Sequence, residues 1–175
     1  AALFHAEEMV NQGADILDVG GESTRPGHIQ ITEDEEIARV TPVIEQLKKR
    51  FDVPVSIDTY KSRVAEAALQ SGADLVNDIW GLKYDENMAE VIARHQAACC
   101  LMQNREQIDY TDYVEDVLDD LRESVQIAKA ADIPDDRIML DPGVGFGKTY
   151  EMNLEIIRVV GRLKELGYPV LLGTS

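Results

Sequence analysis

Cysteine and histidine are scarce in this chain, which excludes disulfide-stapled folds and histidine-based metal sites. The two cysteines, Cys99 and Cys100, are adjacent within an apolar run, where they cannot cross-link a fold. The three histidines are scattered, and none stands at metal-binding spacing from a cysteine. We therefore expect two small buried thiols, no catalytic histidine, and a reducing compartment with the cytoplasm as the default location.

Long apolar runs and an excess of positive charge are also missing from the sequence. The 17 Lys and Arg residues face 33 Asp and Glu residues, which gives a formal net charge of −16. This charge argues against a nucleic-acid partner and against an anionic membrane surface, because both need basic residues. A hydrophobic content of 45% without a membrane-length run predicts a soluble globular protein, with one domain over residues 1–175.

The apolar pattern alternates between short β-branched runs and longer stretches with helical spacing. Strands are predicted over residues 16–19, 53–57, 73–76, 97–102, 137–140 and 169–172. Helices are predicted over residues 37–47, 61–71, 87–95, 114–131 and 153–166. Thr32 and Glu35 form a capping box, while Gly72 and Gly167 serve as left-handed helix caps. This alternation predicts a parallel sheet with right-handed crossovers.

Two parallel architectures compete: a doubly wound open sheet and a TIM (β/α)8 barrel. An open dinucleotide-binding sheet has a glycine fingerprint that leads straight into a helix, whereas Gly20-Gly21 lead into a long loop. Polar residues follow nearly every predicted strand, which favours the barrel. About six of the eight strand–helix units of a barrel are visible. Because the chain starts inside a helix and stops after a strand, we expect a fragment of a longer barrel.

Polar residues and glycines gather where the predicted strands end. The segment 15–27, DILDVGGESTRPG, passes from a short strand into a loop in which Ser23, Thr24 and Arg25 can donate to an anion. The later strand ends carry Asp58-Thr59, Asn77-Asp78, 102–105, Asp141-Pro142-Gly143 with 146–148, and 173–175. Parallel strands of a barrel end on one face, so the sequence predicts a pocket surrounded by these residues.

Structural roles are open for several of these residues. Asp58 could cap the helix over 61–71, and Asn77 could satisfy neighbouring backbone groups. Asp18 and Asp78 are interpreted as structural. Met102 could fill the core, and Lys148 could be solvated. For Asp141 a functional role is favoured, because the following proline holds it in an extended conformation beside the glycine-rich run GVGFG.

Two segments, DILDVGGESTRPG and IMLDPGVGFGKT, strongly resemble the signature segments of bacterial dihydropteroate synthases. Between them, VPVSIDTYKSRVAEAALQSGADLVNDIWG is similar to the middle strands of that family. The resemblance implies a (β/α)8 barrel that condenses 6-hydroxymethyl-7,8-dihydropterin pyrophosphate with 4-aminobenzoate, giving 7,8-dihydropteroate and pyrophosphate for folate synthesis. It also implies a sulfonamide target and a homodimer of the full-length protein.

The resemblance further implies the roles of individual residues. The pterin-binding positions are matched by Asp58, Asn77, Ile79, Met102, Asp141, Phe146 and Gly173. The family's loop that closes over aminobenzoate and pyrophosphate is matched by Ser23, Thr24, Arg25 and Pro26. Asp58, Thr24 and Arg25 are the expected catalytic residues. A carboxylate such as Asp58 can stabilise a cation on the pterin methylene after pyrophosphate departs, while the aniline nitrogen mainly needs positioning.

Three departures from the family pattern matter. The asparagine that ligates Mg²⁺ in the family is expected before residue 1, so no metal ligand is predicted within this chain. The lysine and arginine that follow the GTS-like segment are expected after Ser175. Gln103 stands where many members have histidine.

Three alternatives to the synthase stay open. The first is a pterin-binding methyltransferase that uses methyltetrahydrofolate; the STRPG loop argues against it, because methyl transfer needs no site for an anionic second substrate. The second is a non-catalytic pterin-binding polypeptide. The third is a metal-dependent barrel lyase with Glu22, Asp58 and Asp141 as ligands, which ranks last because no histidine accompanies these acids.

Overall fold

A computed structural model describes residues 2–23 and 29–174 of the chain. Its strands are β1 (Leu17–Gly20), β2 (Val55–Asp58), β3 (Leu75–Asp78), β4 (Ala98–Met102) and β5 (Ile138–Asp141). Its α-helices are α1 (Ala2–Asn11), α2 (Glu33–Arg50), α3 (Ser62–Gln70), α4 (Met88–Arg94), α5 (Tyr113–Ala130), α6 (Tyr150–Arg158) and α7 (Val160–Lys164), and a 3-10 turn, η1, covers Asp135–Arg137. None of the described helices combines the length and apolar composition needed to cross a membrane.

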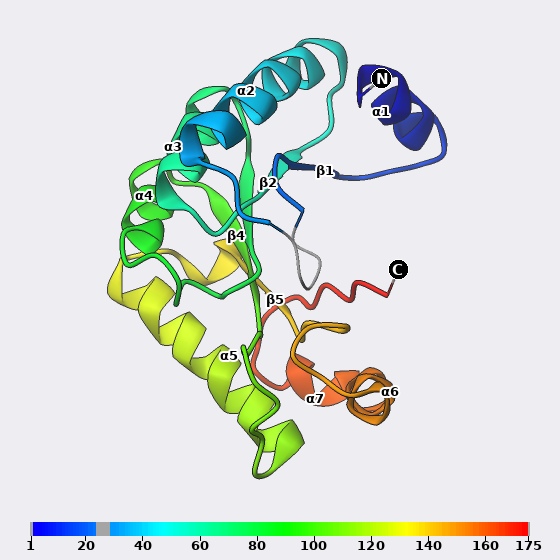
Figure 1. Cartoon of the computed structure of the whole chain (residues 1–175), viewed down its shortest axis with the longest axis vertical. Coiled ribbons are helices and arrows are strands. Elements are labelled where there is room, and N and C mark those ends of the chain that lie inside the picture. The colour runs from blue at the N-terminus through cyan, green and yellow to red at the C-terminus, as the bar shows by residue number, and fades with distance from the viewer. Residues whose placement is uncertain (1, 24–28, 175) are drawn as a thin grey trace.

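The strands form one parallel sheet in the order β1-β2-β3-β4-β5, so each strand pairs with its neighbours in sequence. A doubly wound sheet reverses its strand order at a switch point, and this sheet does not. Helices α2 to α5 lie along one side of the strands (Figure 1). The sheet with its outer helices is therefore part of a (β/α) barrel, as predicted.

The two faces of the sheet differ because side chains alternate along each strand. One face packs against the helices and belongs to the main hydrophobic core; it carries Leu17, Val55, Ile57, Val76, Cys99, Leu101, Ile138 and Leu140. The alternate positions share the other face and include Asp18, Gly20, Ser56, Asp58, Asn77, Cys100, Met102, Met139 and Asp141. Most of the predicted polar site residues are thus on the face away from the helices.

Helix α2 begins as predicted, where the Thr32 hydroxyl accepts a hydrogen bond from the Glu35 amide at 3.2 Å. Its buried stripe is Glu36, Val40, Ile44 and Leu47. The predicted stripe began at Ile37, which is only half-buried. A carboxylate therefore occupies an interior position of this helix.

The glycine junctions after α1 and α3 are copies of one turn. Gly13 and Gly72 have φ values of +98° and +109°, which L-residues with side chains rarely adopt. The amides of the following residues, Ala14 and Ala73, reach back to Met9 and Ala68 carbonyls at 2.9 and 3.0 Å. These bonds close each helix and turn the chain into the next strand, as the repeated Gly-Ala-Asp sequence predicts.

Two predicted elements near the end of the chain are shorter in the structure. The predicted helix over 153–166 is two helices, α6 and α7, which meet at Val159 with φ −100° and ψ 15°. The β-branched pair Val159-Val160 followed by Gly161 weakens helix propensity at this point. The predicted strand over 169–172 is an isolated parallel bridge between Leu140 and Val170.

Candidate functional site

The carboxyl ends of β1, β2 and β3 bring a glycine, an acid and an amide side by side. The parallel register pairs Gly20 with Asp58, and Asp58 with Asn77. A Cβ added at Gly20 would lie 3.6 Å from Asp58 Oδ2, so the backbone of Gly20 lies next to this carboxylate. Two of the predicted pterin-binding residues, Asp58 and Asn77, are therefore neighbours on adjacent strands.

Asp18 belongs to the same group, although the sequence analysis assigned it a structural role. Its side chain is exposed, and its Oδ2 lies 3.5 Å from Asn77 Nδ2. Period-two spacing from Gly20 is the signal that could have placed Asp18 on the site face. The site therefore contains one more carboxylate than the prediction.

The capping interpretation of Asp58 is not needed to explain helix α3. The amide of Ser62, the first residue of α3, donates to Asp85 Oδ2 at 2.7 Å. Asp78, by contrast, is structural as predicted, because it is fully buried and its two carboxylate oxygens accept from the Trp80 and Leu82 amides at 2.9 Å. Two aspartates at adjacent strand ends thus have different environments.

Asp141 lies at the end of β5, opposite Met102 of β4, and is 7% exposed. Its Oδ1 accepts a hydrogen bond from the Gly143 amide at 2.7 Å. Burial raises the pKa of Asp141 to about 6, against the opposing effects of the Gly143 hydrogen bond and the positive charge of Lys148. A carboxylate held in this way gains from a ligand that donates hydrogen bonds to its charged form.

A small apolar cluster, separate from the main core, lies next to these acids. Its buried members are Tyr60, Ile79 and Met102, and the half-buried Trp80 and Phe146 pack against them. The predicted ring-packing residues Ile79, Met102 and Phe146 are therefore brought together, and Tyr60 and Trp80 join them without having been predicted. Gly173 is exposed beyond the Val170 bridge, and no described atom lies within 4 Å of a Cβ added there.

Gln103, directly after β4, and Lys148, in the loop after β5, extend the site. The Lys148 ammonium donates to Gln103 Oε1 at 2.6 Å and to the Phe146 carbonyl at 2.9 Å. Gln103 Nε2 in turn donates to Asp120 at 2.8 Å, and Arg105 holds the same carboxylate through two hydrogen bonds. Burial lowers the pKa of Lys148 to about 8. The expectation that Lys148 is solvated is therefore wrong.

A second polar group, the Lys61 cluster, consists of Glu22, Glu36, Tyr60 and Lys61. The Lys61 ammonium lies 2.7 Å from Glu22 Oε2 and 2.8 Å from Glu36 Oε2, and the Tyr60 hydroxyl donates to Glu22. Burial raises the pKa of Glu22, but hydrogen bonds from Lys61, Tyr60 and the Ile31 amide outweigh it and lower that pKa to about 2. Nothing in the sequence pattern predicts that these four residues meet.

The predicted loop residues lie largely beyond the described part of the chain. Thr24, Arg25 and Pro26 fall outside the described residues, so their predicted roles stay predictions. Ser23 is described and exposed. The described flanks of this segment, Glu22 and Ile31, are joined by a hydrogen bond from the Ile31 amide to Glu22 Oε2 at 2.8 Å.

The described residues offer no ligand set for the Mg²⁺ that the resemblance implies. No group of three or more His, Cys, Asp or Glu side chains within 2–23 and 29–174 converges as metal ligands. The acids proposed for a barrel lyase, Glu22, Asp58 and Asp141, are therefore not gathered into such a set.

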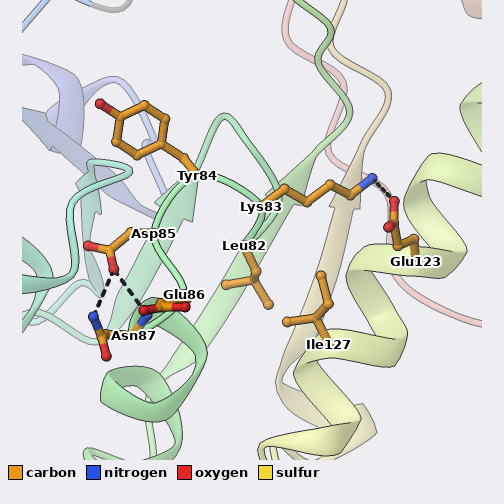
Figure 2. A pocket seen from close by; sticks show the side chains of 8 residues that line it. All are labelled: Leu82, Lys83, Tyr84, Asp85, Glu86, Asn87, Glu123 and Ile127. Carbon is orange, nitrogen blue, oxygen red and sulfur yellow. Dashed lines mark hydrogen bonds and ion pairs between the residues drawn. The ribbon is translucent and has the colours of Figure 1, made fainter.

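A hollow on the outer surface lies between α5 and the loop before α4, away from the acids at the strand ends (Figure 2). Two interactions between residues of its lining are drawn in Figure 2: Lys83 pairs with Glu123 at 2.7 Å, and Asp85 accepts from the Asn87 amide at 3.0 Å. Leu82 and Ile127 form its apolar wall. None of the residues predicted for the site lines it.

Comparison with known proteins gives close relatives over the whole chain. The dihydropteroate synthase of Clostridium beijerinckii is 58% identical over 174 residues, which are 99% of this chain and 65% of that protein. A crystal structure of dihydropteroate synthase from Clostridium difficile in the presence of pteroic acid matches with a TM-score of 0.97 at 52% identity, over 99% of this chain and 66% of that one. A Xanthomonas albilineans dihydropteroate synthase with 4-aminobenzoic acid matches with a TM-score of 0.95 at 38% identity, over 99% of this chain and 63% of that one.

The chain thus spans somewhat less than two thirds of the length of these relatives. The similar solved structures confirm the barrel fold. The sequence profile of the family described as "Pterin binding enzyme" matches residues 1–175, the full extent of the chain. With its site residues on the carboxyl ends of a parallel barrel sheet, the chain belongs to the pterin binding enzyme family.

Proposed function

We propose that the protein is a dihydropteroate synthase, which condenses 6-hydroxymethyl-7,8-dihydropterin pyrophosphate with 4-aminobenzoate to give 7,8-dihydropteroate and pyrophosphate. One observation carries the proposal: Asp58, Asn77 and Asp141 share one face of the sheet beside the apolar cluster of Tyr60, Ile79 and Met102. A flat heterocycle with polar edges needs both kinds of surface. Relatives that carry the synthase name, one of them with pteroic acid, support the same substrate class.

Asp141 is assigned to the aminopyrimidine edge of the pterin. This edge offers adjacent N–H donors, and a carboxylate can accept two of them at once. Because burial holds the pKa of Asp141 at about 6, the free protein has a carboxyl group that gains much from such donors. Asn77 can both donate and accept along the remaining polar edge. Ile79, Met102 and Phe146 then pack against the ring.

The reaction exchanges one bond for another at the pterin methylene. The C–O bond to pyrophosphate breaks, and pyrophosphate leaves with the electron pair. The amine nitrogen of 4-aminobenzoate then forms the new C–N bond and loses one proton to solvent. Asp58 stabilises the positive charge that develops on the methylene, because its carboxylate is fixed at the end of β2 beside Asn77.

Thr24 and Arg25 are assigned to the second substrate. The hydroxyl and guanidinium groups suit an anion such as the carboxylate of 4-aminobenzoate or the departing pyrophosphate. Placing the amine against the methylene supplies most of the catalysis, since an aniline nitrogen is already nucleophilic near neutral pH. Ser23 and Pro26 complete this segment.

Four further properties accompany this proposal. They are Mg²⁺ as the cofactor, a homodimeric full-length protein, a cytoplasmic location and sensitivity to sulfonamides. The location is a prediction from the two cysteines and the other three are predictions from the family resemblance. No ligand for Mg²⁺ is assigned among the described residues.

The proposal is tested by titrating the full-length gene product with a dihydropterin pyrophosphate analogue, and then measuring pyrophosphate release from the true substrate on addition of 4-aminobenzoate. We expect saturable pterin binding and release that depends on 4-aminobenzoate. Pterin binding without this release would favour the methyltransferase or the non-catalytic alternative. Failure to bind any pterin would overturn the proposal.

A further inference from the structure

Both ends of the segment 22–31 meet at the Lys61 ammonium. At one end, Lys61 Nζ lies 2.7 Å from Glu22 Oε2. At the other end, it donates to the Ile31 carbonyl at 3.0 Å, while the Ile31 amide donates to Glu22 Oε2 at 2.8 Å. One side chain therefore closes the base of the segment that contains the STRPG sequence.

The Lys61 ammonium has no donor left for a ligand. Its third hydrogen bond goes to Glu36 Oε2 at 2.8 Å, and an ammonium group has only three N–H donors. The side chain of Lys61 is 9% exposed, and those of Glu22 and Glu36 are each 2% exposed. Such a lysine acts as an anchor, not as a cation that captures an anionic substrate.

A second tie comes from Gln30, next to Ile31. Its side-chain amide donates to the hydroxyl groups of Tyr60 and Tyr84 at 3.0 and 3.1 Å. The two tyrosine rings contact edge to face, with their centroids 4.6 Å apart. Tyr60 also donates to Glu22, so the two ends of the segment are linked through its hydroxyl as well.

The anchoring residues follow Asp58 directly along the chain. The Thr59 amide donates to the Asn77 carbonyl at 3.1 Å, which ties the end of β2 to β3. The Lys61 amide donates to the Thr59 hydroxyl at 3.3 Å, which fixes the turn that carries Tyr60 and Lys61. One short stretch, 58–61, thus connects the acid assigned to the pterin with the base of the 22–31 segment.

Charge also favours a permanent anchor. Burial opposes the ammonium form of Lys61, but hydrogen bonds and attraction from Glu22 and Glu36 outweigh it and raise the pKa of Lys61 above its usual value. The Glu22 carboxylate, with a pKa of about 2, stays ionised throughout the working range. The Lys61–Glu22 ion pair therefore stays in place while substrates bind and leave.

We propose that Lys61 is a positioning residue for the second substrate: it fixes both ends of segment 22–31 to the turn after Asp58. The inference rests on the proposed function and deepens it, because it separates the anchor from the groups that touch the substrates. The second substrate is an aromatic amine that carries a carboxylate. Its binding should depend on Lys61 more than binding of the pterin does.

Kinetics of the full-length gene product test this asymmetry. In Lys61→Met we expect KM for 4-aminobenzoate to rise at least about tenfold, since a lost hydrogen bond to a charged group has this magnitude. KM for dihydropterin pyrophosphate should stay within about threefold, and Lys61→Arg should restore both constants, because arginine keeps the charge and several donors. Gln30→Ala, an exposed and therefore mild change, should raise KM for 4-aminobenzoate by about threefold. Lys48→Met, which removes the Lys48–Asp74 pair elsewhere on α2, should change neither.

Amide hydrogen exchange at Ile31 provides a readout that does not need turnover. We expect faster exchange in Lys61→Met and Gln30→Ala, and unchanged exchange in Lys48→Met. Unchanged exchange at Ile31 in the first two variants would overturn the inference, as would equal increases in the two KM values. Absence of dihydropteroate formation by the wild type would instead overturn the proposed function, and the exchange experiment would still decide whether Lys61 holds the segment.

Discussion

The Lys61 cluster and the Asp141 site both contain buried acids near the carboxyl ends of the strands, but the two acids differ in their hydrogen-bond partners and in the direction of their pKa shifts. In the Lys61 cluster, an ammonium group lies within 2.8 Å of Glu22 and Glu36, and the pKa of Glu22 falls to about 2. Asp141 accepts from one backbone amide, and burial raises its pKa to about 6. The fold stabilises the ionised form of Glu22, whereas ionisation of Asp141 lowers the stability of the fold.

This difference separates an anchor from a binding group. A carboxylate whose hydrogen bonds come from its own protein contributes to stability and has little to gain from a ligand. A carboxylate with a raised pKa gains when a ligand supplies donors, so part of the strain is relieved on binding.

The largest effect is expected when the Lys61 cluster loses its cation. Lys61→Met leaves two buried carboxylates without a counter-charge, so the free energy of unfolding should fall by about 3–5 kcal/mol. The more exposed Lys48–Asp74 pair offers a matched control, and Lys48→Met should cost less than about 1 kcal/mol. Urea denaturation at neutral pH measures both values. Equal losses in the two variants would remove the distinction between the cluster and an ordinary surface pair.

A smaller effect of opposite sign is expected at the second site. The folded-state pKa of Asp141, about 6, lies above the ordinary value of 3.8, so its ionisation destabilises the fold as pH rises through about 6. Asp141→Asn should therefore stabilise the protein by about 2 kcal/mol at pH 8 and by almost nothing at pH 4. The same variant should weaken pterin binding by about 100-fold, since it removes a charged acceptor.

Urea denaturation across this pH range and calorimetric pterin titration check the Asp141 prediction. Asp78→Asn is the control: burial raises the pKa of Asp78 to about 6 as well, but both of its oxygens accept backbone amides, and an amide group cannot replace them. That variant should lose stability at pH 8. A loss of stability in Asp141→Asn at the same pH would contradict the proposed difference between anchoring and binding acids.

The smallest effect concerns how closely β1 approaches the Lys61 cluster. A Cβ at Gly21 would lie 2.8 Å from Val40 Cγ1 and 2.9 Å from Glu36 Cγ, so Gly21→Ala should lower the free energy of unfolding by about 1–2 kcal/mol. Gly161→Ala, within α7, meets no described atom within 4 Å and should stabilise by up to about 1 kcal/mol. Thermal unfolding distinguishes the two signs, and stabilisation by both would show that α2 yields to the added methyl group.

The sheet and much of the site were predictable because their signals are local. Short apolar runs located β1 to β5, and the strand-end positions located Asp58, Asn77 and Asp141. The prediction of a strand over 169–172 was wrong, because this segment forms only one bridge, at Val170. Its hydrogen bonding depends on neighbours that are distant in sequence. The break between α6 and α7 had a local signal, in Val159-Val160-Gly161, that was too weak to outweigh the apolar pattern.

The Lys61 cluster was missed because its members come from three separate segments. Glu22, Glu36 and Lys61 each resemble ordinary surface charges when read alone. The available signal was the spacing of Glu36, four residues before Val40 and in line with Ile44 on the buried stripe of α2. A charged residue in such a stripe calls for a buried partner, but sequence spacing does not say which lysine supplies it. Period-two spacing from Gly20 could have placed Asp18 on the site face, and the observed register agrees with it.

The sequential strand order also has a consequence for how the protein is made. Every strand pairs with the strand before it, so each new unit can dock on a partner that has already left the ribosome. No described strand must wait for a segment at the far end of the chain before it can pair. All residues of the Lys61 cluster have been synthesised by the time α3 begins to form. The strand that carries Asp141, β5, is added later, when Glu22 and Glu36 can already be paired with Lys61.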